Sequence, residues 1–158
     1  MSEASEKAYA LFTAAIGSSE GTGEWFEVTQ GEIDAFADVT RDHQFIHVDP
    51  EACAAMSPWG VPIAHGFLTL SMLTHLSSSI PMDPTRIEGV IMGVNYGFDK
   101  VRFVTPVKVG SKIRATSEIG PVELKGDQVQ VTRHMTVEIE GEERPALVAD
   151  WLTRLVYG

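Results

Sequence analysis

The stretch from Gly66 to Ile80 constrains the fold of this chain more than any other part of the sequence. It has the spacing of an α-helix, and Pro81 follows it as a stop signal. Its apolar side chains cover most of the circumference of such a helix: Phe67, Leu68, Leu70, Met72, Leu73, Leu76 and Ile80. A helix that is apolar nearly all round has to be covered by other elements. We therefore expect the longest helix of the chain here, buried at the centre of the domain.

The chain after this helix is predicted to form strands. Four candidates, separated by proline- and glycine-containing turns such as Gly120-Pro121, cover residues 89–103, 112–119, 128–138 and 146–156. Residues 129–139 alternate in part between apolar and polar side chains, as an antiparallel strand with one buried face does. An antiparallel sheet curved around the central helix would bury both elements. The pattern by itself establishes only the α+β class.

The start of the chain is expected to be an arm in front of one main domain. Residues 1–23 are helix-prone and then form a loop over 18–23, whereas residues 24–158 have the length and composition of one domain with its own core. Thr29 and Glu32 form a capping box for a helix that should end near Asp42.

Composition excludes several classes of protein. The single cysteine cannot form an internal disulfide, and the formal net charge of −10 argues against nucleic acid or an anionic membrane as a partner. The chain has no run of about 18 apolar residues, so no membrane span is expected. The N-terminus lacks the basic and apolar regions of a signal peptide. We therefore expect a cytoplasmic protein.

Asp42 and His47 are the candidate catalytic pair. Five residues apart, they would converge poorly on a continuous helix, where their directions differ by about 140°. Pro50 pushes Asp49 out of helical geometry and favours an irregular or extended loop, in which both side chains can face one small space. A carboxylate and an imidazole so placed could hold one water and move its protons. The alternative is an ion pair that only fixes the loop.

Gly66 is the candidate oxyanion donor. It opens the central helix, where main-chain N–H groups lack helical partners and the helix dipole is positive. The absence of a side chain would let a ligand approach closely. The alternative is that Gly66 only lets the chain turn into a buried helix.

These segments resemble a known family. Residues 36–42 and 47–50, together with Pro62-Ile63-Ala64-His65-Gly66, are similar to the hydratase motif of MaoC-like dehydratases, the (R)-specific enoyl-CoA hydratases. Residues 95–103 resemble its nodulation-protein-N-like subgroup. The family pattern often reads Gly-Asp-x-Asn-Pro-aliphatic-His; here Arg41 replaces the glycine and Gln44-Phe45 replaces Asn-Pro. These departures concern the shape of the loop more than its chemistry.

The resemblance implies a fold, a reaction and partners. The fold is a single hot-dog domain, an antiparallel sheet wrapped around a long buried central helix. The reaction is reversible syn hydration of a trans-2-enoyl thioester to a 3-hydroxyacyl thioester. The expected partner is an acyl-CoA or acyl-carrier-protein thioester, with coenzyme A as part of the substrate and no metal or redox cofactor. Hot-dog proteins usually pair their sheets, so we expect at least a homodimer.

Five further residues are expected to bind substrate. Ala64 and His65 directly precede Gly66 in the motif, and the alternative for His65 is that it only orients the loop. Asn95, the only asparagine, would hydrogen-bond near the site or be structural. Lys100 and Arg102 begin a stretch up to residue 114 that has five cations and no acidic residue, and that stretch could receive a phosphate or be an ordinary solvated strand face.

Four rival interpretations use the same residues or the same fold. His43 and His47, with Asp42 or Asp49, would be metal ligands if they lay on a helix. Cys53 would be a nucleophile, or a buried inert thiol, on its small apolar helix. At the level of function, the alternatives are a hot-dog acyl-CoA thioesterase, which attacks the carbonyl carbon instead of Cβ, and a non-catalytic acyl-thioester binding protein.

Overall fold

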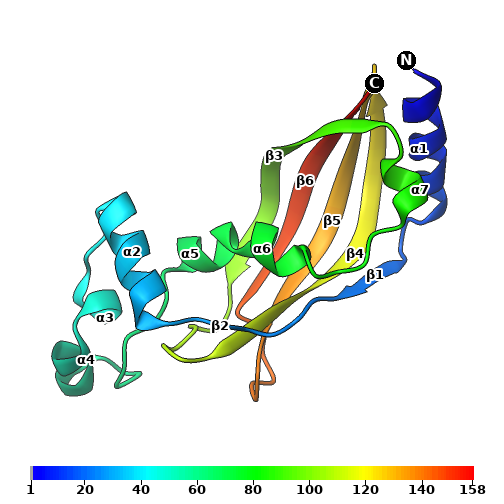
Figure 1. The fold of residues 1–158 in the computed structure, drawn as a ribbon. Helices are drawn as coiled ribbons and strands as arrows, with labels where there is room; N and C mark the ends of the chain where they lie inside the picture. Colours follow the sequence, from blue (N-terminus) through cyan, green and yellow to red (C-terminus); the bar gives the residue numbers. More distant parts are fainter. Residues whose placement is uncertain (1) are drawn as a thin grey trace.

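One curved antiparallel sheet forms the body of the protein, and two short helices lie across its concave side (Figure 1). The computed structural model describes residues 2–158. The sheet has the strand order β1-β4-β5-β6-β3, with β2 beside β4. Its strands are β1 (Ser19–Thr22), β2 (Phe26–Glu27), β3 (Val90–Phe103), β4 (Lys112–Lys125), β5 (Gln128–Ile139) and β6 (Leu147–Tyr157).

Seven helices are found within residues 2–158. They are α1 (Glu3–Ala14), α2 (Gln30–Thr40), α3 (Phe45–Val48), α4 (Pro50–Met56), α5 (Gly66–Ser71), α6 (Leu73–Ser77) and α7 (Pro84–Ile87). The α+β class predicted from the sequence is confirmed. In the part of the chain that the structure describes, no helix has the length and apolar character needed to cross a membrane.

The four long strands occur where the sequence predicts them, with one exception. The turn predicted at Gly120-Pro121 is wrong, because β4 runs on to Lys125. The pairing of β4 with β5 shifts register between Ile119 and Val122, which is a β-bulge. A bulge tolerates a proline, which lacks the N–H needed for the ladder, and lets the strand continue.

The predicted central helix is present in position but wrong in form. It consists of two short helices, α5 and α6, that meet at Met72, and the 12-residue α1 is longer than either. Serine hydroxyls compete for its carbonyl groups: Ser71 Oγ donates to Phe67 O at 2.7 Å and Ser78 Oγ to His75 O at 2.6 Å. Such bonds bend and interrupt helices.

The helix pair is buried on one side only in the single chain. Leu68, Leu73, Leu76 and Ile80 pack on a cluster from the sheet that includes Ile113, Met135, Val137 and Trp151. Phe67, in contrast, is 67% exposed, so the expectation of burial all round is wrong for the isolated chain. This apolar contact holds α5 and α6 across the concave side of the sheet (Figure 1).

The N-terminal segment packs on the same sheet. Ala8 and Phe12 of α1 are buried in a second apolar cluster with Ile119 and Val131. The predicted loop over residues 18–23 is wrong, because Ser19–Thr22 forms β1 and pairs with β4. The division between residues 23 and 24 stays a prediction.

Helices α2, α3 and α4 gather beyond one end of the sheet (Figure 1). The predicted capping box of α2 is confirmed, since the side chains of Thr29 and Glu32 each bond the other's backbone N–H. Asp49 and Pro50 begin α4 as predicted. The irregular or extended loop expected between Asp42 and His47 is wrong in part, because residues 45–48 form the one-turn helix α3.

Candidate active site

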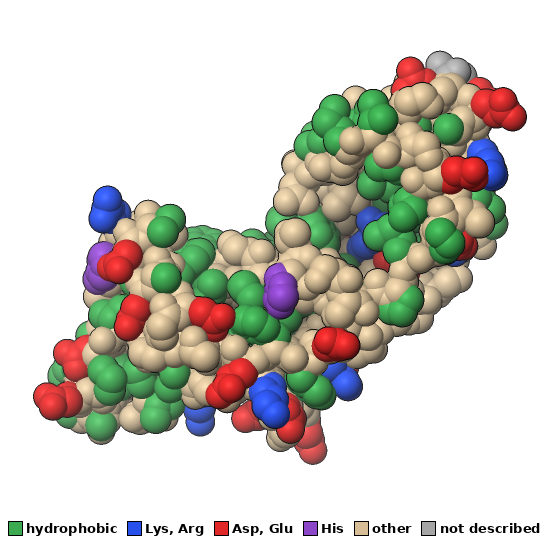
Figure 2. All heavy atoms as spheres, in the orientation of Figure 1, with side chains coloured by type: hydrophobic (Ala, Val, Ile, Leu, Met, Phe, Trp, Pro, Cys, Tyr) green, Lys and Arg blue, Asp and Glu red, His purple; other side chains and the backbone are tan. Residues whose placement is uncertain are grey.

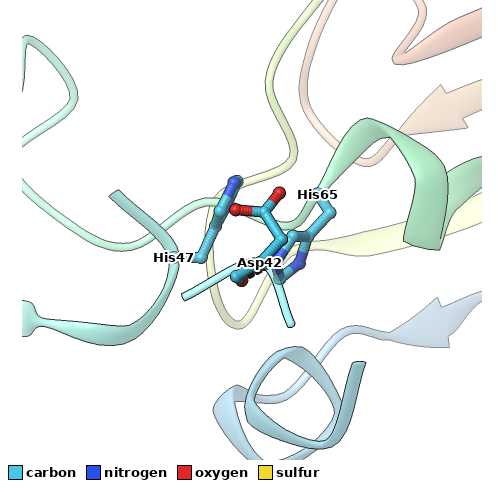
Figure 3. A group of neighbouring side chains, drawn as sticks. All are labelled: Asp42, His47 and His65. Carbon is cyan, nitrogen blue, oxygen red and sulfur yellow. Dashed lines mark hydrogen bonds between the residues drawn. The ribbon is translucent and has the colours of Figure 1, made fainter. Parts of the chain in front are cut away.

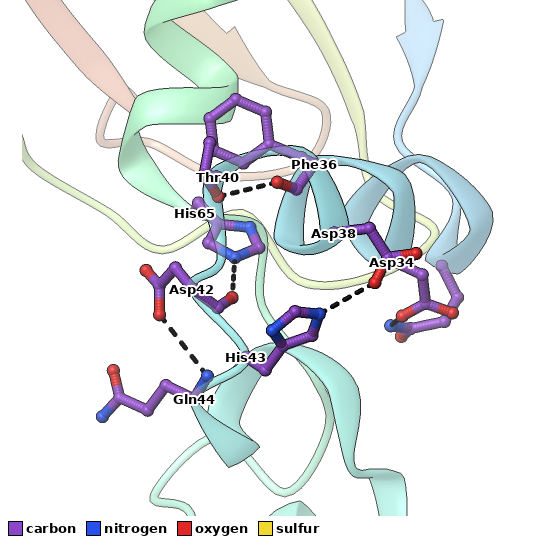
Figure 4. Close-up of polar contacts among 9 residues, drawn as sticks. Asp34, Phe36, Asp38, Thr40, Asp42, His43, Gln44 and His65 are labelled. Atoms are coloured by element: carbon purple, nitrogen blue, oxygen red, sulfur yellow. Dashed lines mark hydrogen bonds and ion pairs between the residues drawn. The ribbon is translucent and has the colours of Figure 1, made fainter.

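Asp42 lies in the loop between α2 and α3. Arg41 ends α2 in a left-handed backbone conformation, with φ of 65°, and this redirects the chain away from the helix axis. The Asp42 carboxylate accepts a hydrogen bond from the Gln44 N–H at 3.4 Å (Figure 4). Its side chain is otherwise exposed in the single chain, so the carboxylate is accessible to water or a ligand.

His47 projects from α3 and is only 6% exposed. Its Nδ1 lies 2.7 Å from the Ile63 carbonyl oxygen. A carbonyl oxygen can only accept a hydrogen bond, so the proton of the neutral ring is on Nδ1 and the lone pair is on Nε2. The local fold thus fixes both the tautomer and the direction of the ring.

The environment of His47 keeps it a neutral base. Burial lowers the pKa of His47 below its usual 6.5 and is the largest effect. The hydrogen bond to Ile63 raises this pKa, His65 lowers it, and the Asp42 carboxylate raises it. Because the net shift is downward, His47 is unprotonated at neutral pH and can accept a proton.

His65 completes the cluster. It precedes α5, is 3% exposed, and stacks on His47 with ring centroids 3.7 Å apart. Its Nε2 donates to the main-chain oxygen of Asp42 at 3.0 Å (Figure 4), while its Nδ1 is buried without a hydrogen-bond partner in the described chain. His65 therefore ties the loop of Asp42 to the start of α5. The sequence signal for this role was the position of His65 directly before the helix.

The three side chains converge from three separate segments (Figure 3). One carboxylate oxygen of Asp42 and one nitrogen from each of His47 and His65 lie within 4.8 Å of one another. The structure therefore brings the predicted pair Asp42 and His47 together. Their arrangement can hold a water molecule between a carboxylate and an imidazole lone pair.

The predicted metal alternative involved a different set of residues. His43 bonds the Asp38 carboxylate at 2.8 Å and lies before the first residue of α3, so it is not on one helix with His47. Among residues 2–158, the one group of potential ligands is Asp42, His47 and His65. The rings of His47 and His65 stack 3.7 Å apart and are inclined by only 22°, so their in-plane lone pairs lie in two separate, nearly parallel planes. Ligands of one tetrahedral ion must instead converge.

Gly66 is the first residue of α5, and its N–H has no acceptor within that helix. The ring of Phe103 lies so close that a Cβ on Gly66 would be 2.9 Å from Phe103 Cγ. Gly66, Ala64 and Phe103 line a cavity of about 270 Å³. Ala64 is 6% exposed, and its N–H donates to Val107 O at 2.7 Å. The glycine is therefore required by close packing.

The other predicted binding residues lie on β3. Asn95 lines a different cavity, on the concave side of the sheet. Lys100 Nζ is 3.6 Å from the Asp150 carboxylate, and Arg102 Nη1 donates to Val101 O at 2.7 Å. In the described part of the chain, no hydrogen bond or ion pair joins any of the three to Asp42 or His47. Lys112 and Arg114 of the same cationic stretch also pair with carboxylates, which reduces its net charge.

Cys53 is fully buried on α4, and its thiol donates to Phe45 O at 3.4 Å. Burial raises the pKa of the Cys53 thiol, with a smaller contribution from Asp49. A raised pKa lowers the fraction of reactive thiolate. These facts support the interpretation as an inert thiol.

A curved antiparallel sheet around a helix pair, with a carboxylate and two imidazoles close to the start of that pair, defines this protein as a member of the hot-dog class. The MaoC like domain model matches residues 12–140, and the chain belongs to that family. Nodulation protein N of Rhizobium leguminosarum bv. viciae is 50% identical over 87% of this chain and 84% of its own length. The 3-hydroxyacyl-thioester dehydratase Z of Mycobacterium tuberculosis is 47% identical over 90% of this chain and 92% of its own length.

Solved structures confirm the hot-dog fold. The (R)-hydratase from A. caviae involved in PHA biosynthesis superposes with a TM-score of 0.65 and 21% identity, covering 87% of this chain and 94% of that one. The family and the fold implied by the sequence motifs are therefore confirmed.

Proposed function

We propose that this chain is a hydro-lyase that reversibly adds water to a trans-2-enoyl thioester and forms an (R)-3-hydroxyacyl thioester. The observation that carries the proposal is the neutral, buried His47 with its lone pair on Nε2 beside the Asp42 carboxylate. The names of related proteins support the same reaction, since one is a 3-hydroxyacyl-thioester dehydratase.

In the proposed mechanism, His47 acts as base and then as acid. Nε2 of His47 accepts a proton from water as the water oxygen bonds to Cβ. The Cα=Cβ electron pair moves toward the thioester carbonyl and forms an enolate. The imidazolium then returns the proton to Cα on the same face, so that one water is added syn. General acid/base help of this kind contributes roughly 10²–10⁴-fold in rate.

Asp42 and Gly66 would stabilise the charges that develop. The Asp42 carboxylate accepts a hydrogen bond from the second proton of the water and favours the imidazolium form, because it raises the pKa of His47. The Gly66 N–H would donate to the enolate oxygen, and the cavity beside Ala64 and Gly66 would receive the thioester. One oxyanion donor is typically worth about 10²–10³-fold in turnover.

The substrate is proposed to carry coenzyme A or an acyl carrier protein as its thiol. The chemistry described needs no metal ion or redox cofactor. Lys100 and Arg102 are proposed to meet the charged part of the carrier, since their side chains are exposed at the edge strand β3. Their partners in the single chain would be exchanged for phosphate oxygens.

We also propose a homodimer formed through β3. This strand lies at the end of the sheet order and has an unpaired edge. Its exposed apolar side chains are Ile91, Met92, Val94, Tyr96 and Phe103. Open apolar edges pair readily with another chain, and a contiguous exposed apolar patch marks an interaction site. Pairing of two β3 strands would join the sheets and cover the patch.

The test is hydration of crotonyl-CoA, followed by loss of enoyl-thioester absorbance with free thiol assayed in parallel. Wild type, Asp42→Ala and His47→Ala are compared with Asp38→Ala as a matched control, because Asp38 pairs with His43 outside the cluster. Rapid loss in wild type and the control only, without thiol release, is expected. Thiol release would favour the thioesterase. If the wild type hydrates neither short nor long enoyl chains, the non-catalytic binding protein becomes the favoured interpretation.

A further inference from the structure

A row of polar side chains crosses the concave, otherwise apolar face of the sheet. Arg133 on β5 donates from Nε to the Glu20 carboxylate of β1 at 2.9 Å and from Nη1 to Thr153 Oγ1 of β6 at 2.8 Å. Ser117 of β4 donates to the same Glu20 carboxylate at 2.6 Å. Asn95 of β3 pairs in register with Thr153 and extends the row to the sheet edge.

This row separates the two apolar clusters of the protein. On β5, Val131 belongs to the cluster under α1 and Met135 to the cluster under α5 and α6, with Arg133 between them. The side chains of Glu20 and Arg133 are only 6% and 8% exposed. Replacing a buried ion pair with apolar residues is often neutral or stabilising, so stability alone does not explain this one.

Arg133 has N–H donors that are not used within the described part of the protein. A guanidinium has five N–H donors, and two of them are used by Glu20 and Thr153. The remaining donors have no acceptor within residues 2–158. The guanidinium also faces the ring of Phe12, 5.8 Å from its centroid. Because Arg133 lines a cavity, these donors can reach an acceptor from outside the chain.

A cavity opens above the row. Its volume is about 230 Å³, with Glu20, Arg133, Thr153 and Asn95 in its lining and Met82 and Leu155 among its apolar walls. Figure 2 shows this face hollowed, with basic and acidic atoms at the bottom and apolar atoms around the hollow. Whole ligands usually occupy about 300–1,000 Å³, so the cavity fits one segment of a larger ligand.

The cavity lies farther along the same helix pair that begins at Gly66. Thr74 and Ser77 of α6 line it. They follow Gly66 by eight and eleven residues, and at 1.5 Å per residue this gives at most about 12–17 Å, because α5 and α6 meet at a break at Met72. An extended carbon chain with bonds of about 1.5 Å needs on the order of ten carbons to cover that distance.

We propose that this cavity receives the distal part of the acyl chain and that this part bears a neutral oxygen group, a hydroxyl or a carbonyl. The oxygen accepts a hydrogen bond from Arg133, and Asn95 supplies a second polar contact. A carboxylate is disfavoured, because the adjacent Glu20 already balances the charge of Arg133 and would repel a second anion. This substrate class rests on the proposed hydratase function.

The experiment compares two trans-2-enoyl-CoA substrates of equal length, on the order of ten carbons, one plain and one with a hydroxyl near its distal end. The measured quantity is the ratio of their kcat/KM values, and the ratio of Kd values of their saturated analogues is measured alongside. Wild type should prefer the hydroxylated chain by about 10-fold or more in both ratios.

Two variants and one control test the residues. Glu20→Gln combined with Arg133→Met removes the donor without leaving a lone buried charge, and Asn95→Leu removes the amide without touching the ion pair. Both should lose most of the preference. Gln128→Leu, on β5 but outside the cavity lining, should keep it. If the double variant does not fold, Asn95→Leu still decides the point.

The failures are distinguishable. The proposed substrate class would be overturned, while crotonyl-CoA hydration stands, if wild type used the two substrates equally well, with both ratios near one. An undiminished preference in Asn95→Leu and in the double variant would overturn it too. If no enoyl-CoA is hydrated, the proposed function fails, and the Kd ratio alone then decides whether the cavity selects an oxygen-bearing chain.

Discussion

The imidazole rings of His47 and His65 stack, with their centroids 3.7 Å apart and their planes inclined by 22°. Each ring is also tied to a main-chain carbonyl by a different nitrogen, His47 Nδ1 to Ile63 and His65 Nε2 to Asp42. The stack therefore links the loop of Asp42, helix α3 and the start of α5 in one unit. That unit sets the direction of the Nε2 lone pair of His47.

His65 is expected to act as a positioning residue. In His65→Phe a flat ring of similar size can keep the stack, but the bond to the Asp42 carbonyl is lost. We expect kcat on crotonyl-CoA to fall by about 10- to 100-fold, because small displacements of catalytic groups are costly, with little change in KM. The pKa of His47, followed by NMR, should rise, since His65 lowers it in the wild type. A lower Tm with unchanged kcat and pKa would show that His65 only packs.

The lowered pKa of His47 predicts how stability depends on pH. The folded-state pKa lies below the unfolded value of 6.5, so protonation favours the unfolded chain. The contribution of neutral His47 is therefore fully present above pH 6.5 and is lost as the pH falls toward the folded-state pKa. Urea unfolding of wild type and His47→Gln between about pH 5 and 8 measures this contribution to the free energy of unfolding.

The difference in unfolding free energy between these two proteins should shrink as the pH falls. The acid limb of kcat/KM should likewise have an apparent pKa below 6.5 in the wild type. A difference in stability that grew on acidification would contradict the downward shift. His43→Gln is the control, because His43 is exposed and bonded only to Asp38.

Gly66→Ala should disturb the site through a steric contact. The new Cβ would lie 2.9 Å from Phe103 Cγ, so the ring or the start of α5 has to move. We expect a loss of at least about 10-fold in kcat/KM, because the proposed oxyanion N–H moves with it. Gly31→Ala is the matched control near the start of α2, where the nearest neighbour of the new Cβ is 3.8 Å away.

The control variant Gly31→Ala should gain about 0.5–1 kcal/mol in stability, since alanine is a better helix former than glycine. Thermal unfolding and crotonyl-CoA kinetics on both variants make the comparison. Full activity of Gly66→Ala would show that Phe103 can give way and that the site does not require a residue without a side chain at position 66.

Local signals predicted much of this fold. The reciprocal bonds of Thr29 and Glu32 and the Asp49-Pro50 start of α4 depend on residues close in sequence, and the strand patterns depend on a two-residue period. The pairing of Asp42 with His47 was also within reach, because both lie in one short segment.

Other features depend on contacts between distant segments. The strand β1 forms because Ser19–Thr22 meets the edge of β4, and no local pattern indicates it. The stacking of His65 on His47 and the ion pair of Glu20 with Arg133 join residues 18 and 113 positions apart. The break at Met72 reflects serine hydroxyls that bond helix carbonyls, which an apolar pattern does not reveal.

A charge on the free edge of the sheet should separate the proposed dimer. Met92 is 54% exposed on β3, and a lysine there would place two like charges across a β3–β3 interface. We expect Met92→Lys to shift the protein toward monomer in sedimentation velocity over a range of concentrations. Val39→Lys is the matched control, because Val39 on α2 is 83% exposed and lies away from this edge. It should sediment as the wild type does. If Met92→Lys and wild type sediment alike as dimers, the interface lies elsewhere, and if the wild type is itself a monomer at all concentrations, the apolar face of β3 needs another partner.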